Sequence, residues 1–171
     1  MKKVLETPRL LLRELENSDV NRLAEIYADP DVMRYIGRGG VLGFDRAQKS
    51  VENWQKYYEW FSFGNWATIE KETGSFIGLC GLSWLEDKSD VEVSYLFAKV
   101  AWGKGYATEI AEAIIKYGFE NAGLKRIVAL VYPQNAPSIH VIEKLGMKYE
   151  CDRIFFGDKL LHVYSLEKNE T

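Results

Sequence analysis

The chain has 171 residues, a length that fits one domain with its own hydrophobic core. Hydrophobic residues make up 47% of it and charged residues 27%, with a formal net charge of −3, which indicates a soluble globular protein. This balance gives no global field that favours nucleic acid or an anionic membrane, and no apolar stretch is long enough to span a bilayer. We therefore expect a single domain over residues 1–171. Because the two cysteines form no CxxC pair, we also expect a location in the reducing cytoplasm and no disulfide.

The first third of the chain predicts one strand followed by helices. Residues 9–14 (RLLLRE) are typical of a strand, and apolar residues at helical spacing predict a helix over about 20–27. Pro30 then opens a short helix that runs through Tyr35. Four glycines within residues 37–43 (GRGGVLG) predict a loop, which is also a candidate wall of a binding site. The next helix has an apolar stripe that comprises Ala47, Val51, Trp54 and Tyr58.

From residue 65 the hydrophobic pattern changes from helical spacing to alternation. In chain order we expect two strands within 65–86 that turn at 72–74, a strand over 91–97, a helix over 105–121, a strand over 126–132, a short helix over 135–145 and a hairpin over 147–167. The strand–helix–strand unit over 91–132 should be a parallel crossover within a mostly antiparallel sheet. The predicted fold class is therefore α+β.

The segment VAWGKGYATE, residues 100–109, places two glycines between a strand and a helix. Such a connection presents unpaired backbone N–H groups and the positive end of the helix dipole, and it predicts an anion site. An ordinary tight connection between a strand and a helix also favours glycine. Thr108 does not fit the nicotinamide fingerprint G-x-G-x-x-G, and Lys104 precedes Gly105 where a P-loop requires the reverse order.

The segment WGKGYATE, the later stretch QNAPSIHVIEKLGMKY and the opening ETPRLLLRELENSDVNRLAEIYADPDVMRYIG together resemble the GNAT superfamily of acyl-coenzyme A N-acyltransferases. They are most similar to the branch that contains the ribosomal-protein N-terminal acetyltransferases. The resemblance extends over nearly the whole chain, with the motifs in the right order. It implies a single-domain GNAT-like fold with flanking helices, acetyl-CoA as co-substrate, direct transfer to an amine without a metal, and, at the level of the family, a homodimer.

The resemblance assigns coenzyme contacts residue by residue. The family's pyrophosphate loop falls on residues 100–105, where Val100 replaces the usual Gln or Arg. The pantetheine arm would lie between the strands that end at Phe97 and Tyr132. Asn135 matches an asparagine that contacts the coenzyme, although a helix N-cap alone also explains it. The implied coenzyme-binding residues are Leu96, Phe97, Trp102, Gly103, Lys104, Gly105, Tyr106, Ala107, Thr108, Asn135 and Ser138.

Direct attack of an amine on the thioester requires no enzyme nucleophile. Glu92 is the predicted general base, because partial burial on a core strand would raise its pKa, whereas a solvent-facing glutamate is the alternative. Many members of the family carry a tyrosine acid where this chain has Ile142, and Ser138 matches a serine of the ribosomal branch that would hydrogen-bond to the thiolate. Backbone N–H groups near Leu96 or Phe97, at a local bulge, would stabilise the oxyanion.

Several functions stay open at this point. The leading hypothesis is acetylation of a protein N-terminal α-amine. The alternatives are acetylation of a small-molecule amine such as a polyamine, amino sugar or amino acid, and a non-catalytic acyl-CoA-binding module, with phosphoryl transfer as a third class. His140 and His162 are too few and too scattered to predict a zinc site, so we expect no metal.

Overall fold

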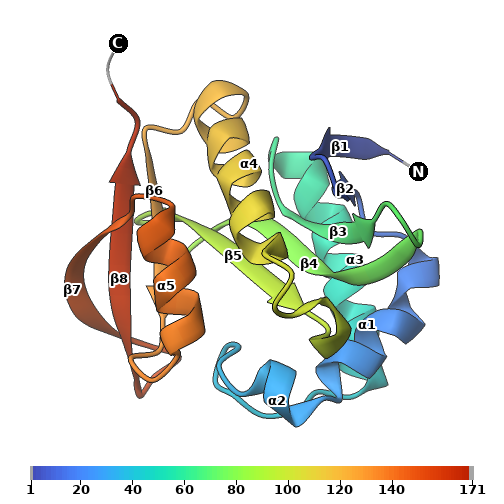
Figure 1. Ribbon diagram of the computed structural model, residues 1–171. Helices are drawn as coiled ribbons and strands as arrows, with labels where there is room; N and C mark the ends of the chain where they lie inside the picture. The colour runs from blue at the N-terminus through green and yellow to red at the C-terminus, as the bar shows by residue number, and fades with distance from the viewer. Residues whose placement is uncertain (1, 170–171) are drawn as a thin grey trace.

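The computed structural model describes residues 2–169 and contains a mixed eight-stranded sheet with helices on both faces (Figure 1). The strand order is β1-β2-β3-β4-β5-β6-β8-β7. The strands are β1 (Lys3–Glu6), β2 (Leu10–Arg13), β3 (Asn65–Glu70), β4 (Ser75–Trp84), β5 (Val91–Phe97), β6 (Arg126–Val131), β7 (Lys148–Phe155) and β8 (Lys159–Glu167). The helices are α1 (Val20–Tyr27), α2 (Pro30–Met33), α3 (Phe44–Trp60), α4 (Tyr106–Glu120) and α5 (Ala136–Lys144), with 3-10 turns at Asn17–Asp19 and Lys99–Ala101.

Two hydrophobic layers hold the helices against the sheet. Helix α4 buries Ile110 and Ile114 completely in a cluster that includes Val93 of β5, whereas α1 and α3 bury Leu23 and Val51 in a second cluster. Figure 1 shows the corresponding arrangement, with α4 and α5 in front of the sheet and α1 and α3 behind it. The helical spacing of these apolar residues thus accounts for the side of each helix that faces the sheet.

The predicted crossover is confirmed: β5 and β6 pair in parallel, and every other neighbouring pair of strands is antiparallel. The predicted α+β class is confirmed as well. The sequence prediction missed β1, a strand of only four residues that pairs with β2 across the turn at Thr7. Helix α2 ends at Met33, two residues before the predicted end.

Strands β5 and β6 share only one ladder position, at which Glu92 pairs with Val128. On its far side β6 pairs with β8 over its whole length, from Arg126 to Val131. The two parallel strands therefore diverge after Glu92, and the sheet opens between the carboxyl-terminal halves of β5 and β6. We call this opening the β5–β6 slot.

The bulge expected at Leu96 or Phe97 is absent, and that prediction was wrong. Strands β4 and β5 pair without a register shift from Trp84 opposite Val91 to Gly78 opposite Phe97, and the irregularity lies instead between β3 and β4. At the end of this pairing only glycine fits at position 78, because the Leu96 carbonyl oxygen lies 1.9 Å from the place that a Cβ of Gly78 would occupy. Without that Cβ, the backbones of β4 and β5 approach each other closely at this point.

Candidate active site

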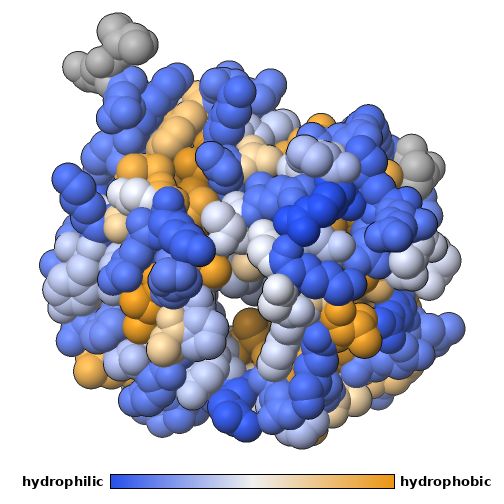
Figure 2. Space-filling view, in the orientation of Figure 1, coloured by the Kyte–Doolittle hydropathy of each residue, from blue (hydrophilic) through white to orange (hydrophobic). Residues whose placement is uncertain are grey.

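The β5–β6 slot opens into a hollow on the face that carries α4 and α5. Figure 2 shows this hollow near the centre of the view, bounded by α5, by the N-terminal end of α4 and by the loop that follows α2. The carboxyl-terminal end of β5 points toward it (Figure 1). Helix N-terminus, slot and loop thus meet at one place, where the sequence prediction puts most of the site residues.

The N-terminus of α4 presents a row of unpaired backbone donors. Gly105 is the N-cap with a φ of 77°, and Gly103 has a φ of 72° with nothing within 4 Å of a would-be Cβ. None of the N–H groups of residues 103–108 donates a hydrogen bond of good geometry to an acceptor within residues 2–169. Together with the positive end of the helix dipole, these donors form an anion-binding arrangement into which no side chain intrudes.

Side chains from outside the loop hold it in place. The indole N–H of Trp102 donates to the Phe97 carbonyl oxygen at 2.9 Å, which ties the loop to the end of β5. The guanidinium of Arg9 donates to the Lys104 carbonyl oxygen at 2.8 Å and to the Glu109 carboxylate at 2.7 Å. These contacts use carbonyl and carboxylate oxygens as acceptors, so they fix the loop without using its N–H groups.

The side chains of Lys104 and Tyr106 point away from the helix N-terminus, toward Glu70 of β3. The Tyr106 hydroxyl donates to the Glu70 carboxylate at 2.7 Å and the Lys104 ammonium donates at 3.0 Å. These hydrogen bonds, from Tyr106 first and then from Lys104, lower the pKa of Glu70 to about 2. The Tyr106 hydroxyl thus uses its only proton on Glu70, whereas the 46% exposed Lys104 side chain keeps further N–H donors beside its ion pair.

Glu92 lies at the point where the slot begins. Its half-buried carboxylate accepts a hydrogen bond from the backbone N–H of Leu130 on β6. Burial raises the pKa of Glu92 to about 7, although the Leu130 hydrogen bond opposes the rise. A carboxylate of this pKa changes its protonation near neutral pH, which is the property that a general base requires.

Asn135 and Ser138 lie at the N-terminus of α5, beside the slot. The Asn135 side chain caps the helix by accepting the Ser138 N–H at 3.4 Å. The Ser138 hydroxyl forms a 2.8 Å hydrogen bond with the hydroxyl of Tyr95 on β5. Sequence reasoning missed Tyr95 as a site residue, although the alternation along β5 placed it on the same face as Val93.

The structure brings the predicted residues together from both faces of the sheet. The α4 N-terminus and Ser138 lie on the α4–α5 face, and Leu96 and Phe97 end the strand between them. Glu92 and Tyr95 are three residues apart on a regular strand, so their side chains leave β5 on opposite faces. The Glu92 side chain therefore lies on the face opposite Tyr95 and Ser138, at the point where the slot begins.

The loop after α2 closes the slot at one end. The Tyr132 hydroxyl donates to the Gly37 carbonyl oxygen at 2.7 Å, and Arg38 pairs with Asp158 at 3.3 Å and donates to the Phe156 carbonyl oxygen in the β7–β8 turn. The glycine-rich segment predicted as a binding-site wall thus connects the end of β6 with the hairpin beyond it.

The buried cysteine Cys80 lies opposite Tyr95 on the neighbouring strand β4, and His140 lies on α5. Cys80 is fully buried, and desolvation raises the pKa of its thiol to about 12, which leaves it unsuited to act as a nucleophile. His162 hydrogen-bonds to Asp152 on the neighbouring strand. Within residues 2–169 no group of His, Cys, Asp and Glu side chains is arranged to hold a metal ion, and none of the helices there could cross a membrane.

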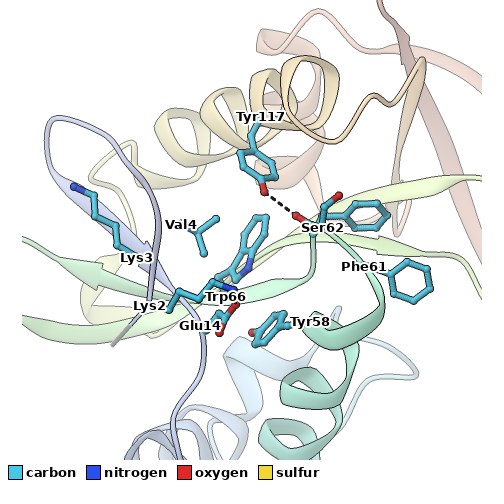
Figure 3. A pocket seen from close by; sticks show the side chains of 10 residues that line it. Lys2, Lys3, Val4, Glu14, Tyr58, Phe61, Ser62, Trp66 and Tyr117 are labelled. Atoms are coloured by element: carbon cyan, nitrogen blue, oxygen red, sulfur yellow. Dashed lines mark hydrogen bonds and ion pairs between the residues drawn. The ribbon is translucent and has the colours of Figure 1, made fainter.

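A second cavity, of about 260 Å³, lies at the opposite end of α4 (Figure 3). Its lining includes Lys2, Glu14, Tyr58, Trp66 and Tyr117. The Lys2 ammonium pairs with the Glu14 carboxylate at 2.6 Å, and the Tyr117 hydroxyl donates to the Ser62 carbonyl oxygen at 2.7 Å. None of the predicted site residues lines this cavity, so it is separate from the β5–β6 slot.

Comparison with known proteins identifies the family. The family model described as the acetyltransferase (GNAT) domain matches residues 9–148. The uncharacterized protein YkkB of Bacillus subtilis (strain 168) is 37% identical over 149 residues, which cover 85% of both chains. The uncharacterized N-acetyltransferase p20 of Bacillus licheniformis is 31% identical over 147 residues, which cover 85% of this chain and 83% of that protein.

Solved structures show the same fold. The crystal structure of a GNAT-family acetyltransferase from Bacillus anthracis superposes with a TM-score of 0.80 at 28% identity, covering 95% of this chain and 96% of that one. RimL, a ribosomal L7/L12 α-N-protein acetyltransferase in complex with coenzyme A, gives a TM-score of 0.81 at 13% identity, covering 97% and 98% of the two chains. At that identity the likeness to RimL concerns the fold alone. Because the family model covers most of the chain and two relatives exceed 30% identity, the chain belongs to the GNAT acetyltransferase family and is an acetyl-CoA-dependent N-acetyltransferase.

Proposed function

We propose that this enzyme transfers the acetyl group of acetyl-CoA to the α-amine of a protein N-terminus. The observation that carries the proposal is the β5–β6 slot, with unpaired N–H donors at one end and the Glu92 carboxylate at the other. The N–H groups of residues 103–108 bind the coenzyme's diphosphate, and Trp102 keeps their loop in place. The diverging edges of β5 and β6 bind the pantetheine arm in the manner of an added strand.

In the chemical step the amine attacks the thioester carbon directly. A C–N bond forms and the C–S bond breaks, Glu92 accepts the proton that the amine loses, and the departing thiolate takes its proton from water. The Ser138 hydroxyl donates a hydrogen bond to the thiolate while it forms. Because Glu92 reaches the slot from the face opposite α5, amine and coenzyme approach each other from opposite sides of the sheet.

The pKa of the base supports an α-amine as the acceptor. An N-terminal amine has a pKa of about 7.7–8.0, whereas a lysine side chain or a comparable alkylamine has one near 10.4. Proton transfer to a carboxylate of pKa about 7 is less unfavourable from the first kind of amine than from the second. RimL, which shares the fold, is a ribosomal L7/L12 α-N-protein acetyltransferase, which agrees with this choice. A small molecule with an amine of similarly low pKa is the second candidate.

A thiol-release assay with acetyl-CoA tests the proposal. We expect turnover with peptides that carry a free N-terminus, little turnover with the same peptides blocked at the N-terminus and supplied with a lysine, and a loss of turnover in Glu92→Gln. Coenzyme binding without turnover on any amine would favour a non-catalytic acyl-CoA-binding module. The proposal also includes one catalytic domain over residues 1–171 and, with both cysteines free, a reducing compartment such as the cytoplasm.

A further inference from the structure

The enzyme lacks the tyrosine that many family members place on the helix beside the slot. Ile142 occupies that position and is only 2% exposed. It packs in the hydrophobic cluster that also contains Met147, so no hydroxyl reaches the slot from this turn of α5. Ser138, one turn earlier, is the remaining hydroxyl of α5 that lies beside the slot.

A tyrosine reaches Ser138 from the neighbouring strand instead. Tyr95 of β5 and Ser138 of α5 are 43 residues apart in sequence, and their hydroxyl oxygens lie 2.8 Å apart. The Tyr95 ring stacks on Phe97 at a centroid distance of 6.4 Å and an interplanar angle of 29°. Because the Phe97 carbonyl oxygen accepts the Trp102 indole N–H, the same residues orient the phenol and hold the coenzyme-binding loop.

The direction of the hydrogen bond between the two hydroxyls determines what Ser138 can do. A phenol is the stronger donor of the two, and burial raises the pKa of Tyr95 to about 12, so Tyr95 keeps its proton at neutral pH. When Tyr95 donates, Ser138 accepts, and the single proton of Ser138 is left to point elsewhere. The proposed function places the thioester sulfur in the slot beside α5, where it can accept that proton.

We propose that Tyr95 is a positioning residue that orients the Ser138 hydroxyl so that it donates a hydrogen bond to the thiolate of coenzyme A. This inference rests on the proposed function, because it assumes that the coenzyme's sulfur lies in the β5–β6 slot. Tyr95 transfers no proton itself. The phenol that contacts Ser138 thus comes from β5, since α5 carries Ile142 where many family members have a tyrosine.

Binding of coenzyme A and of desulfo-coenzyme A, measured by calorimetry at pH 9, isolates the contact with sulfur. We expect the wild-type enzyme to bind coenzyme A about tenfold more tightly than the desulfo compound, the effect of one hydrogen bond to a charged group. Tyr95→Phe and Ser138→Ala should each remove most of this ratio, and the double variant should lose no more than either alone. Since the ratio is measured within each variant, a general loss of stability cancels.

Tyr117→Phe is the matched control, because it removes a hydroxyl with a 2.7 Å hydrogen bond at the far end of α4. It should leave the ratio unchanged. In turnover, Tyr95→Phe should lower kcat about tenfold and leave the KM for acetyl-CoA nearly unchanged. A wild-type ratio near one, or a Tyr95→Phe ratio equal to that of wild type, would overturn this inference alone, whereas a wild-type enzyme that binds neither compound would overturn the proposed function with it.

Discussion

Replacing Gly105 with alanine tests the coenzyme-binding role of the α4 N-terminus. Gly105 has a φ of 77°, and a Cβ there would lie 3.6 Å from the Arg9 guanidinium, which is ordinary contact without a clash. The perturbation is therefore conformational: a residue with a Cβ loses about 1–2 kcal/mol in the left-handed region. If the loop relaxes to a negative φ, the N–H groups of residues 103–108 turn away from a common centre. Losing one charge-assisted hydrogen bond to the diphosphate lowers the affinity about tenfold or more.

Calorimetry with coenzyme A measures the effect, and urea unfolding measures the change in stability. Gly123→Ala is the matched control, because Gly123 follows α4 at its other end, has a φ of 69° and has nothing within 4 Å of a would-be Cβ. Both variants should lose about 1–2 kcal/mol of unfolding free energy at most, but only Gly105→Ala should lose affinity. Equal affinity for coenzyme A in the wild type and in both variants would refute the assignment of the diphosphate to these N–H groups.

Three further predictions follow from charged and buried groups. Because the pKa of Glu92 is raised from about 4.5 to about 7, kcat/KM of the wild type should rise with pH up to about 7, and Glu92→Gln should lose this rise; a wild-type profile without it would exclude Glu92 as the base. The folded state binds the Glu92 proton more tightly than the unfolded state does, so the stability of the wild type relative to Glu92→Gln should fall as the pH rises from about 4.5 to 7. Iodoacetamide should leave the Cys151→Ser variant fully active at pH 8, because the buried Cys80 thiol has a pKa of about 12 and stays protonated and unreactive. Inactivation of this variant by iodoacetamide under native conditions would contradict the prediction. Arg13→Met should lower the free energy of unfolding, measured in urea, by about 3–5 kcal/mol, because it leaves the buried Asp19 carboxylate without its partner at 2.7 Å. Asp19→Asn in the same chain should restore part of the loss, and an unchanged urea midpoint in Arg13→Met would refute this prediction.

The sequence predicted most of the fold because the local signals agree with the tertiary structure. The alternation of 91–97 and the helical spacing that follows it gave β5 and α4 nearly to the residue. Strand β1 was missed because four residues carry too little periodicity, and its pairing with β2 depends on contacts across a turn. The bulge prediction rested on the family resemblance alone, and the pairing of β4 with β5 continues to Phe97 without a register shift.

The site was predictable in its backbone and less so in its side chains. The spacing of Gly103 and Gly105 before a helix indicated the unpaired N–H groups directly, since both residues adopt a positive φ. Glu109, in the first turn of α4, accepts hydrogen bonds from Thr7 and Arg9 in the turn between β1 and β2. Such partners, about 100 residues apart, leave no local pattern in the sequence, and the contact between Tyr95 and Ser138 was missed for the same reason.

A crystal structure of the enzyme with coenzyme A bound tests the central claim most directly. We expect the diphosphate oxygens about 2.7–3.2 Å from backbone nitrogens of residues 103–108, with the pantetheine arm between β5 and β6. A diphosphate bound elsewhere, for instance beside Lys2 in the cavity at the opposite end of α4, with the nitrogens of residues 103–108 out of its reach, would contradict both the assigned site and the mechanism derived from it.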